Sequence, residues 1–197
     1  ETEVLVDVCL DLLETMAVGK PRVLDVGTGS GVIAVTLARE NKSALVTATD
    51  ISSRALSLAR QNAVFHKCEK QIEFLEGSGM EPLKARGEPF DLVVSNPPYV
   101  GVCTQHLVDK SVSMYEPREA VFARNNGLEM YEALFKECPR FMKPGAPLVL
   151  EIGAGAKRQV CQEARIWAWR ESSVKKDLAG IDRCLVFAHG NQERRYS

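Results

Sequence analysis

The chain has 197 residues, enough for one substantial hydrophobic core and short for two, because domains usually run to roughly 100–200 residues. Hydrophobic residues make up 45% and charged residues 26%, a balance that excludes wholly disordered, collagen-like and coiled-coil chains. The 25 basic and 26 acidic side chains leave a net charge of −1, so no general positive field favours nucleic acid or an anionic membrane as a partner.

No apolar run approaches the roughly 18 residues of a membrane span, and the first residues do not have the pattern of a signal peptide. A cytoplasmic location is therefore expected, with an organelle matrix as the alternative. The cysteines are scattered, without a CxxC pair or neighbouring histidines, so we predict no metal site. We expect them to be free thiols, buried or partly buried. They are Cys9, Cys68, Cys103, Cys138, Cys161 and Cys184.

Helices and strands alternate along the chain, beginning with an amphipathic helix over residues 2–17. Its apolar residues recur every three or four positions from Val4 to Met16, which is the spacing of one helical face. A buried strand over 22–26 then leads directly into a glycine cluster over 27–31. The next predicted elements are a helix over 32–40, a strand over 44–50, a helix from Ser52 or Ser53 to about residue 63, and strands over 72–76 and 90–95.

The second half continues the alternation after the turn-rich sequence NPPYV and a long polar loop over 101–126. Its predicted elements are a helix over 127–142, a strand over 147–152, a helix over 156–170, and strands over 172–176 and 184–188. Alternating strands and helices need crossover connections. The sequence therefore predicts an α/β fold, a doubly wound, mostly parallel seven-stranded sheet with helices on both faces.

Three glycines crowd the turn between the first strand and the following helix. Gly27, Gly29 and Gly31 let the backbone approach a ligand, and the helix start presents free N–H groups. Val32 stands where a dinucleotide fingerprint has its third glycine, so a diphosphate fits less well than a ligand without phosphates. Asp50 ends the second strand, where its carboxylate could accept hydrogen bonds from both hydroxyls of a ribose. We predict a nucleoside-type cofactor, S-adenosylmethionine ahead of NAD; the alternative is a tight turn with an acid that caps the next helix.

Two further segments belong to the predicted cofactor site. Ser78, Gly79 and Met80 follow the third strand, where this topology would place them beside the adenine. Met80 could equally be an ordinary core residue. Ile51 directly follows Asp50, and we predict that it also contacts the cofactor.

The tetrapeptide Asn96-Pro97-Pro98-Tyr99 follows an apolar strand and so lies at the carboxyl edge of the sheet, where open parallel sheets bind ligands. The two prolines fix their own φ angles and donate no N–H, and Pro97 restricts Asn96 to extended geometry. The side-chain oxygen of Asn96 and the carbonyl of Pro97 can each accept one hydrogen of a planar amino group, and Tyr99 can lie against its flat face. The alternative is a plain turn after a strand.

An amide or aromatic amine nitrogen is a poor nucleophile because its lone pair is delocalised. Holding both hydrogens of such a nitrogen favours its attack on a methyl group that is already electrophilic. We therefore predict Asn96, Pro97 and Tyr99 as catalytic residues. No metal ion or covalent nucleophile is needed for this chemistry.

Taken together, these segments resemble the class I S-adenosylmethionine-dependent methyltransferases and, more narrowly, the release-factor glutamine methyltransferases (HemK/PrmC family). NPPY alone is shared with adenine methyltransferases, whereas the YEPR sequence is the narrower discriminator. The motifs that carry the resemblance are ETE at 1–3, LDVGTGSG at 24–31, Asp50, VSNPPYV at 94–100, YEPREA at 115–120, NGL at 126–128 and DLAGIDR at 177–183.

The resemblance implies methyl transfer from S-adenosyl-L-methionine, which leaves S-adenosyl-L-homocysteine, to the glutamine of a release factor's GGQ loop. It implies that Asp50 holds the ribose and that Asn96 contacts both cofactor and substrate. Met80 departs from the aromatic residue that some members place beside the adenine. The residues implied to cradle the methionine end are Gly27, Thr28, Gly29, Ser30 and Gly31, and those implied to line the glutamine pocket are Asn96, Pro97, Pro98 and Tyr99.

The resemblance also implies a domain organisation and a partner. Residues 1–190 are expected to form one methyltransferase domain and residues 191–197 a polar tail, without the family's N-terminal helical domain. The expected partner is a release factor, bound by a monomer, with neither nucleic acid nor membrane involved. The alternatives are methylation of adenine in nucleic acid, methylation of a glutamine in a ribosomal protein, a cofactor-binding module without turnover, and a nicotinamide-dependent oxidoreductase.

Overall fold

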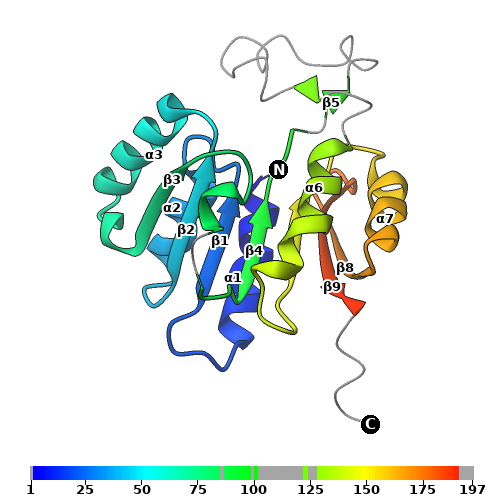
Figure 1. Cartoon of the computed structure of the whole chain (residues 1–197), viewed down its shortest axis with the longest axis horizontal. Coiled ribbons are helices and arrows are strands. Elements are labelled where there is room, and N and C mark those ends of the chain that lie inside the picture. Colours follow the sequence, from blue (N-terminus) through cyan, green and yellow to red (C-terminus); the bar gives the residue numbers. More distant parts are fainter. Residues whose placement is uncertain (1, 85–86, 99, 102–121, 124–127, 191–197) are drawn as a thin grey trace.

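The computed structural model describes residues 2–84, 87–98, 100–101, 122–123 and 128–190. It is built on a seven-stranded sheet with the order β3-β2-β1-β4-β7-β9-β8 (Figure 1). The strands of this sheet are β1 (Arg22–Val26), β2 (Leu45–Asp50), β3 (Ile72–Glu76), β4 (Leu92–Ser95), β7 (Leu148–Glu151), β8 (Trp169–Lys176) and β9 (Asp182–His189). The short strands β5 (Val100–Gly101) and β6 (Phe122–Ala123) pair with each other in a separate sheet.

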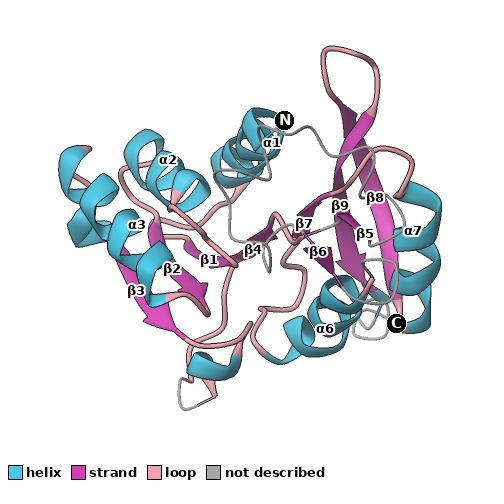
Figure 2. Cartoon of the chain, turned by 90° about the horizontal axis from the view of Figure 1, so that it is seen from above, coloured by secondary structure: helices cyan, strands magenta, loops and turns pink. Residues whose placement is uncertain are grey.

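Helices cover both faces of the large sheet. Figure 2 shows α1, α2 and α3 on one side and α6 and α7 on the other. Among the described residues, the α-helices are α1 (Thr2–Thr15), α2 (Val32–Glu40), α3 (Ser53–Phe65), α6 (Glu129–Glu137) and α7 (Lys157–Ile166), and the short 3-10 helices are η1 (Glu69–Gln71), η2 (Glu81–Leu83) and η5 (Cys138–Arg140).

Each central strand divides its side chains between the two faces, as a pleated strand must. In β1, Val23 packs in the core cluster under α1 and α2, whereas Leu24 packs in the second cluster with residues of α6 and α7. In β4, Leu92 and Val93 divide in the same way. Both faces are therefore buried, which explains why these strands read as nearly continuous apolar runs.

The strand pairing confirms the predicted fold class. Strands β1, β2, β3, β4 and β7 run parallel, and β9 is antiparallel to both β7 and β8. The chain passes from β1 outwards to β2 and β3, and then returns to β4 on the other side of β1. The point between β1 and β4 is thus the topological switch point, where open α/β sheets bind their ligands.

The predicted helix over 127–142 is too long and is corrected by the structure. Helix α6 ends at Glu137, and the 3-10 helix η5 follows because Pro139 has no N–H with which to continue the α-helical ladder. The carbonyl of Phe135, which that N–H would have reached, instead accepts a hydrogen bond of 2.8 Å from the indole N–H of Trp169. Residue 127 lies outside the described residues.

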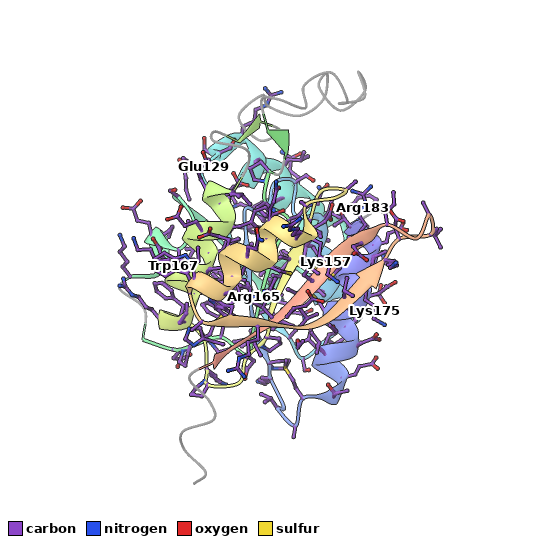
Figure 3. The ribbon with its side chains drawn as sticks, turned by 90° about the vertical axis from the view of Figure 1, so that its right-hand side faces the viewer. Glu129, Lys157, Arg165, Trp167, Lys175 and Arg183 are labelled. Carbon is purple, nitrogen blue, oxygen red and sulfur yellow. The ribbon has the colours of Figure 1, made fainter. Side chains whose placement is uncertain are left out.

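The predicted helix over 156–170 also ends too late, and the two C-terminal strands are longer than expected. Helix α7 ends at Ile166, and Ala168 takes a left-handed φ of 62° before Trp169 enters β8. Figure 3 shows α7 against the β8–β9 hairpin, with Lys157 at one end of the helix and Trp167 beyond the other. The Lys157 ammonium lies 3.1 Å from the carboxylate of Glu171 in β8, which helps to hold the helix there.

The cysteine prediction is confirmed for the described part of the chain. Cys9, Cys68, Cys138 and Cys184 are buried free thiols, and Cys161 is half-buried and free. Cys103 lies outside the described residues, as do most of the predicted loop over 101–126 and the tail over 191–197. Within the described ranges, no helix has the length and apolar character to cross a membrane.

Candidate active site

The loops after β1 and β4 lie side by side at the carboxyl edge of the sheet. Val26 and Ser95 are register partners at the ends of these two strands, and the Ser95 hydroxyl donates to the Val26 carbonyl at 2.7 Å. The next residues along the two strands are Gly27 and Asn96. The predicted glycine loop and the predicted Asn-Pro-Pro corner are therefore neighbours.

The three loop glycines take positive φ angles that other residues rarely adopt. The values are 73° at Gly27, 57° at Gly29 and 85° at Gly31. A Cβ at Gly27 or Gly29 would meet nothing within 4 Å, so open space lies in front of that part of the loop. A Cβ at Gly31 would instead lie 2.9 Å from the Cβ of Ala59 in α3. Gly31 thus supplies the close helix packing that a dinucleotide fingerprint assigns to its third glycine.

Backbone and side-chain hydrogen bonds fix the shape of the glycine loop. The amides of Gly27 and Thr28 both donate to the Thr49 carbonyl in β2, each at 2.9 Å. On the far side, the Asn62 side chain of α3 donates to the Ser30 carbonyl at 2.9 Å. The loop is consequently tied both to the neighbouring strand and to the helix packed against it.

Asp50 lies at the carboxyl end of β2, facing the loop. One carboxylate oxygen accepts from the Gly29 amide at 2.8 Å, and the other accepts from the Ser52 amide at 2.9 Å. Ser52, not Asp50, is the N-cap of α3, because its hydroxyl accepts from the amide of Ala55. Two carboxylate oxygens provide about four acceptor positions, so both can bind further hydroxyls without giving up these contacts.

A second acid, Asp25 in β1, was not predicted as a site residue. It is fully buried, and the hydroxyl of Thr28 donates to its Oδ2 at 2.6 Å. Within the described chain its Oδ1 has no hydrogen bond of normal geometry. Burial raises the pKa of Asp25 to about 7, against the lowering effect of the Thr28 hydroxyl and the Ala34 backbone N–H, and the charge of Asp50 raises it further.

The segment after β3 contains the other residues of the predicted cofactor site. Gly79 has a φ of 54°, a methyl group on its Cα would meet no atom within 4 Å, and Ile51 beside Asp50 is 74% exposed. Met80 is only 2% exposed and packs in the core cluster with Leu24. Its side chain thus has the core role that the sequence also allowed.

The Asn-Pro-Pro corner presents its amide in a defined orientation. Pro97 is buried and Asn96 and Pro98 are half-buried, whereas Tyr99 lies outside the described residues. The Asn96 amino group donates to the hydroxyl of Thr2 at 3.3 Å, so its donor side is used within the fold. The carbonyl oxygen of the amide lies on the opposite side from this amino group.

Comparison with known proteins identifies the family. A family model described as methyltransferase small domain matches residues 6–115, more than half of the chain. The matched region includes the glycine loop, Asp50 and the Asn-Pro-Pro corner. The chain belongs to the methyltransferase small domain family.

One curated relative of this methyltransferase domain is informative. It is 39% identical over 188 residues to a release factor glutamine methyltransferase of Enterococcus faecalis, which confirms the resemblance seen in the motifs. The match covers 94% of the chain and 65% of the relative, so the chain spans less than two thirds of that protein's length.

Solved structures share the fold of the methyltransferase domain. A methyltransferase of Pyrococcus furiosus superposes with a TM-score of 0.66 at 19% identity, covering 94% of this chain and 83% of the other. An RNA methyltransferase of Salinibacter ruber in complex with S-adenosyl-L-homocysteine superposes with a TM-score of 0.54 at 19% identity, covering 92% and 87%. Both comparisons agree with the class I methyltransferase fold predicted from the sequence.

Proposed function

We propose that this methyltransferase domain transfers a methyl group from S-adenosylmethionine to the side-chain amide nitrogen of a glutamine in a peptide chain release factor. The observation that carries the proposal is the register of β1 and β4, which sets Gly27 beside Asn96 at the switch point. A cofactor in the glycine loop and an amide held at the Asn-Pro-Pro corner would then be neighbours. The relative in Enterococcus faecalis supports glutamine as the acceptor.

The residues on the cofactor side fit S-adenosylmethionine. The loop from Gly27 to Gly31, including Thr28 and Ser30, would hold the methionine end, because open space lies in front of Gly27 and Gly29. Asp50 would accept from the ribose hydroxyls through its remaining lone pairs. Ile51 and Gly79 would flank the adenine, with Met80 beneath them in the core.

Charge also favours this cofactor over a phosphate-bearing one. S-adenosylmethionine carries a positive sulfonium and an ammonium group, and when bound it supplies an electrophilic methyl group. Asp50 lies beside the loop, where its carboxylate would repel a diphosphate. Val32, 54% exposed at the start of α2, takes the place of the glycine that a pyrophosphate loop would have.

On the substrate side, the carbonyl oxygens of Asn96 and Pro97 would accept the two hydrogens of a glutamine amide. This arrangement orients the nitrogen and favours a pyramidal geometry, which makes the lone pair available for attack. Pro98 and Tyr99 would complete the pocket for the glutamine side chain. The proton leaves to water as the nitrogen becomes cationic, so no dedicated general base is required.

The proposal includes the setting of the reaction. Residues 1–190 would act as one methyltransferase domain and as a monomer, followed by a polar tail over 191–197. A release factor partner places the reaction in the cytoplasm, where translation ends. The acidic balance of the chain, with a net charge of −1, gives no support to a nucleic-acid partner.

The function is tested by methyl labelling of competing acceptors. The chain is incubated with tritiated S-adenosylmethionine and a release factor, a release factor with the GGQ glutamine changed to glutamate, ribosomal proteins, or DNA. We expect label on the intact release factor alone, with mass spectrometry placing one methyl group on that glutamine. Labelling of DNA, or equal labelling of the glutamate variant, would contradict the proposal.

A further inference from the structure

Three polar groups from distant parts of the chain form a continuous hydrogen-bonded row at the site. The Asn96 amino group donates to the Thr2 hydroxyl at 3.3 Å, and that hydroxyl donates to Oε2 of Glu151 at 3.0 Å. Thr2 begins α1, Asn96 follows β4 and Glu151 ends β7. Figure 1 shows the start of the chain beside the carboxyl end of β4.

Glu151 is an unusual residue for its position. Its neighbours in β7 are apolar and buried, and Glu151 itself is only 2% exposed. A carboxylate in such a place costs free energy unless it is hydrogen-bonded. The Tyr131 hydroxyl of α6 donates to the Glu151 backbone carbonyl at 3.0 Å, which helps to fix the end of the strand. The backbone at Glu151 is thus fixed, and its side-chain Oε2 accepts from Thr2.

The row determines which end of the Asn96 amide can serve as an acceptor. A side-chain amide turned by half a revolution would exchange its oxygen and its amino group. The Thr2 hydroxyl has one hydrogen, which Glu151 takes, so Thr2 offers only lone pairs to Asn96. An amide oxygen facing Thr2 would find no donor there. The amino group must therefore face Thr2 and the oxygen must face away from it.

The same row strengthens that oxygen as an acceptor. A hydrogen bond to a carboxylate polarises the hydroxyl, and linked hydrogen bonds polarise one another in a low-dielectric surrounding. Charge from Glu151 is in this way passed through Thr2 to the Asn96 amide, whose carbonyl oxygen becomes more negative. That change favours a pyramidal, partly cationic nitrogen over a planar one at the substrate.

We infer that Thr2 and Glu151 are positioning residues, which orient and polarise the Asn96 amide for its contact with the substrate nitrogen. The inference rests on the proposed function for the identity of the reaction. It also gives α1 a role beyond covering the sheet, because the first residue of the described helix completes the site. A purely structural tie between α1 and β7 would predict a loss of stability on removing the hydroxyl and no change in turnover.

The test compares Thr2→Val, which keeps the shape but removes the hydroxyl, with Thr2→Ser, which keeps the hydroxyl. Thr15→Val is the matched control, since Thr15 lies at the other end of α1 and its hydroxyl donates to the Leu12 carbonyl at an exposed site. We expect Thr2→Val to lower kcat roughly tenfold with unchanged cofactor affinity, the size of one lost charge-assisted hydrogen bond. Thr2→Ser and Thr15→Val should retain kcat within about twofold.

A second readout does not depend on activity. The side-chain amide protons of Asn96 are assigned by NMR from their absence in Asn96→Ala. One of them should shift upfield in Thr2→Val and keep its position in Thr2→Ser and Thr15→Val. Glu151→Gln keeps an acceptor for Thr2 but removes its charge, and should lower kcat about threefold.

The possible results distinguish the positioning role of Thr2 from the proposed function. An active wild type whose Thr2→Val variant has the same kcat and the same Asn96 amide signal would overturn the positioning role. A loss of kcat shared equally by Thr2→Ser would also overturn it, because the hydroxyl would not be the cause. If the wild type methylates no glutamine, the proposed function fails, while the Asn96 amide signal still decides whether Thr2 holds that side chain.

Discussion

Replacing Asp25 with asparagine should change how the stability of the chain depends on pH. In the folded chain, burial raises the pKa of this carboxyl from 3.8 to about 7. The folded protein therefore keeps the proton up to about pH 7, whereas the unfolded chain has lost it above about pH 4. Between these values the folded state binds more protons, so the free energy of unfolding must fall as the pH rises.

The magnitude follows from the same pKa. The rise from 3.8 to about 7 corresponds to about 4 kcal/mol of interaction that favours the protonated form. At pH 5 a protonated Asp25 and an asparagine are nearly isosteric, and each can accept from the Thr28 hydroxyl. The two proteins should then agree within about 1 kcal/mol. About 3 kcal/mol of the total falls between pH 5 and pH 8, so at pH 8 the asparagine variant should be more stable than wild type by about 3 kcal/mol.

Urea unfolding at several pH values between 5 and 8 measures this difference. Asp177→Asn is the control that should keep a constant difference from wild type between pH 5 and 8, because backbone N–H groups and Arg183 at the β8–β9 turn hold the pKa of Asp177 below its usual value and leave it ionised throughout that range. Its contribution to stability is present at neutral pH and is lost as the pH falls through the folded pKa. The reasoning about Asp25 is refuted if wild type and Asp25→Asn keep a constant difference in stability across the whole range.

Three further predictions concern the cofactor loop and the corner. Calorimetry should show that wild type binds S-adenosylmethionine several-fold more tightly as Asp25 ionises between about pH 6 and 8. The affinity of the Asp25→Asn variant should not change over the same pH range. Gly31→Ala should lower the free energy of unfolding by about 3 kcal/mol, because the new Cβ would lie 2.9 Å from the Cβ of Ala59 and the backbone has a left-handed φ. Gly29→Ala should lower it by only about 1–2 kcal/mol, because its Cβ would meet no atom within 4 Å and only the left-handed φ opposes the change. Urea titration measures the difference. Asn96→Ala should reduce methyl transfer at least about a hundredfold while calorimetry shows cofactor binding preserved, and equal turnover would defeat its proposed role.

The sequence predicted the strands of the parallel core closely because the local and global signals agree there. Strands β1 and β3 and helix α2 begin and end at the predicted residues. Each is a short apolar segment bounded by glycine, proline or polar residues, and each is buried on the face that its pattern indicates. The adjacency of Gly27 and Asn96 depends on the pairing of β1 with β4, which the alternation of strands and helices allows but does not determine.

The predicted ends of two helices were wrong because contacts with distant elements determine where those helices end. Apolar residues continue past Pro139, so periodicity alone extended the helix, but the freed Phe135 carbonyl is satisfied by Trp169 from another element. Trp167 and Trp169 continue an apolar pattern after α7, yet the second of them is drawn into β8 by pairing with His189. Such terminations depend on partners that spacing does not reveal.

Three site residues could not be predicted from the sequence for the same reason, because their roles depend on contacts with distant parts of the chain. Asp25 stands inside an apolar strand, and only the pairing of β1 with strands on both sides shows that its carboxyl is wholly buried. Thr2 and Glu151 are separated by 149 residues, so no local motif could join them. An acid in the last position of an otherwise apolar strand was the available signal for Glu151, because a buried charge requires a partner.

A crystal structure of the chain with S-adenosylhomocysteine and a GGQ-containing peptide tests the central claim most directly. We predict that the glutamine amide lies between the side-chain oxygen of Asn96 and the carbonyl of Pro97, with its nitrogen facing the sulfur atom in the glycine loop. A glutamine bound elsewhere on the domain would contradict the claim, as would an Asn96 oxygen turned back towards Thr2.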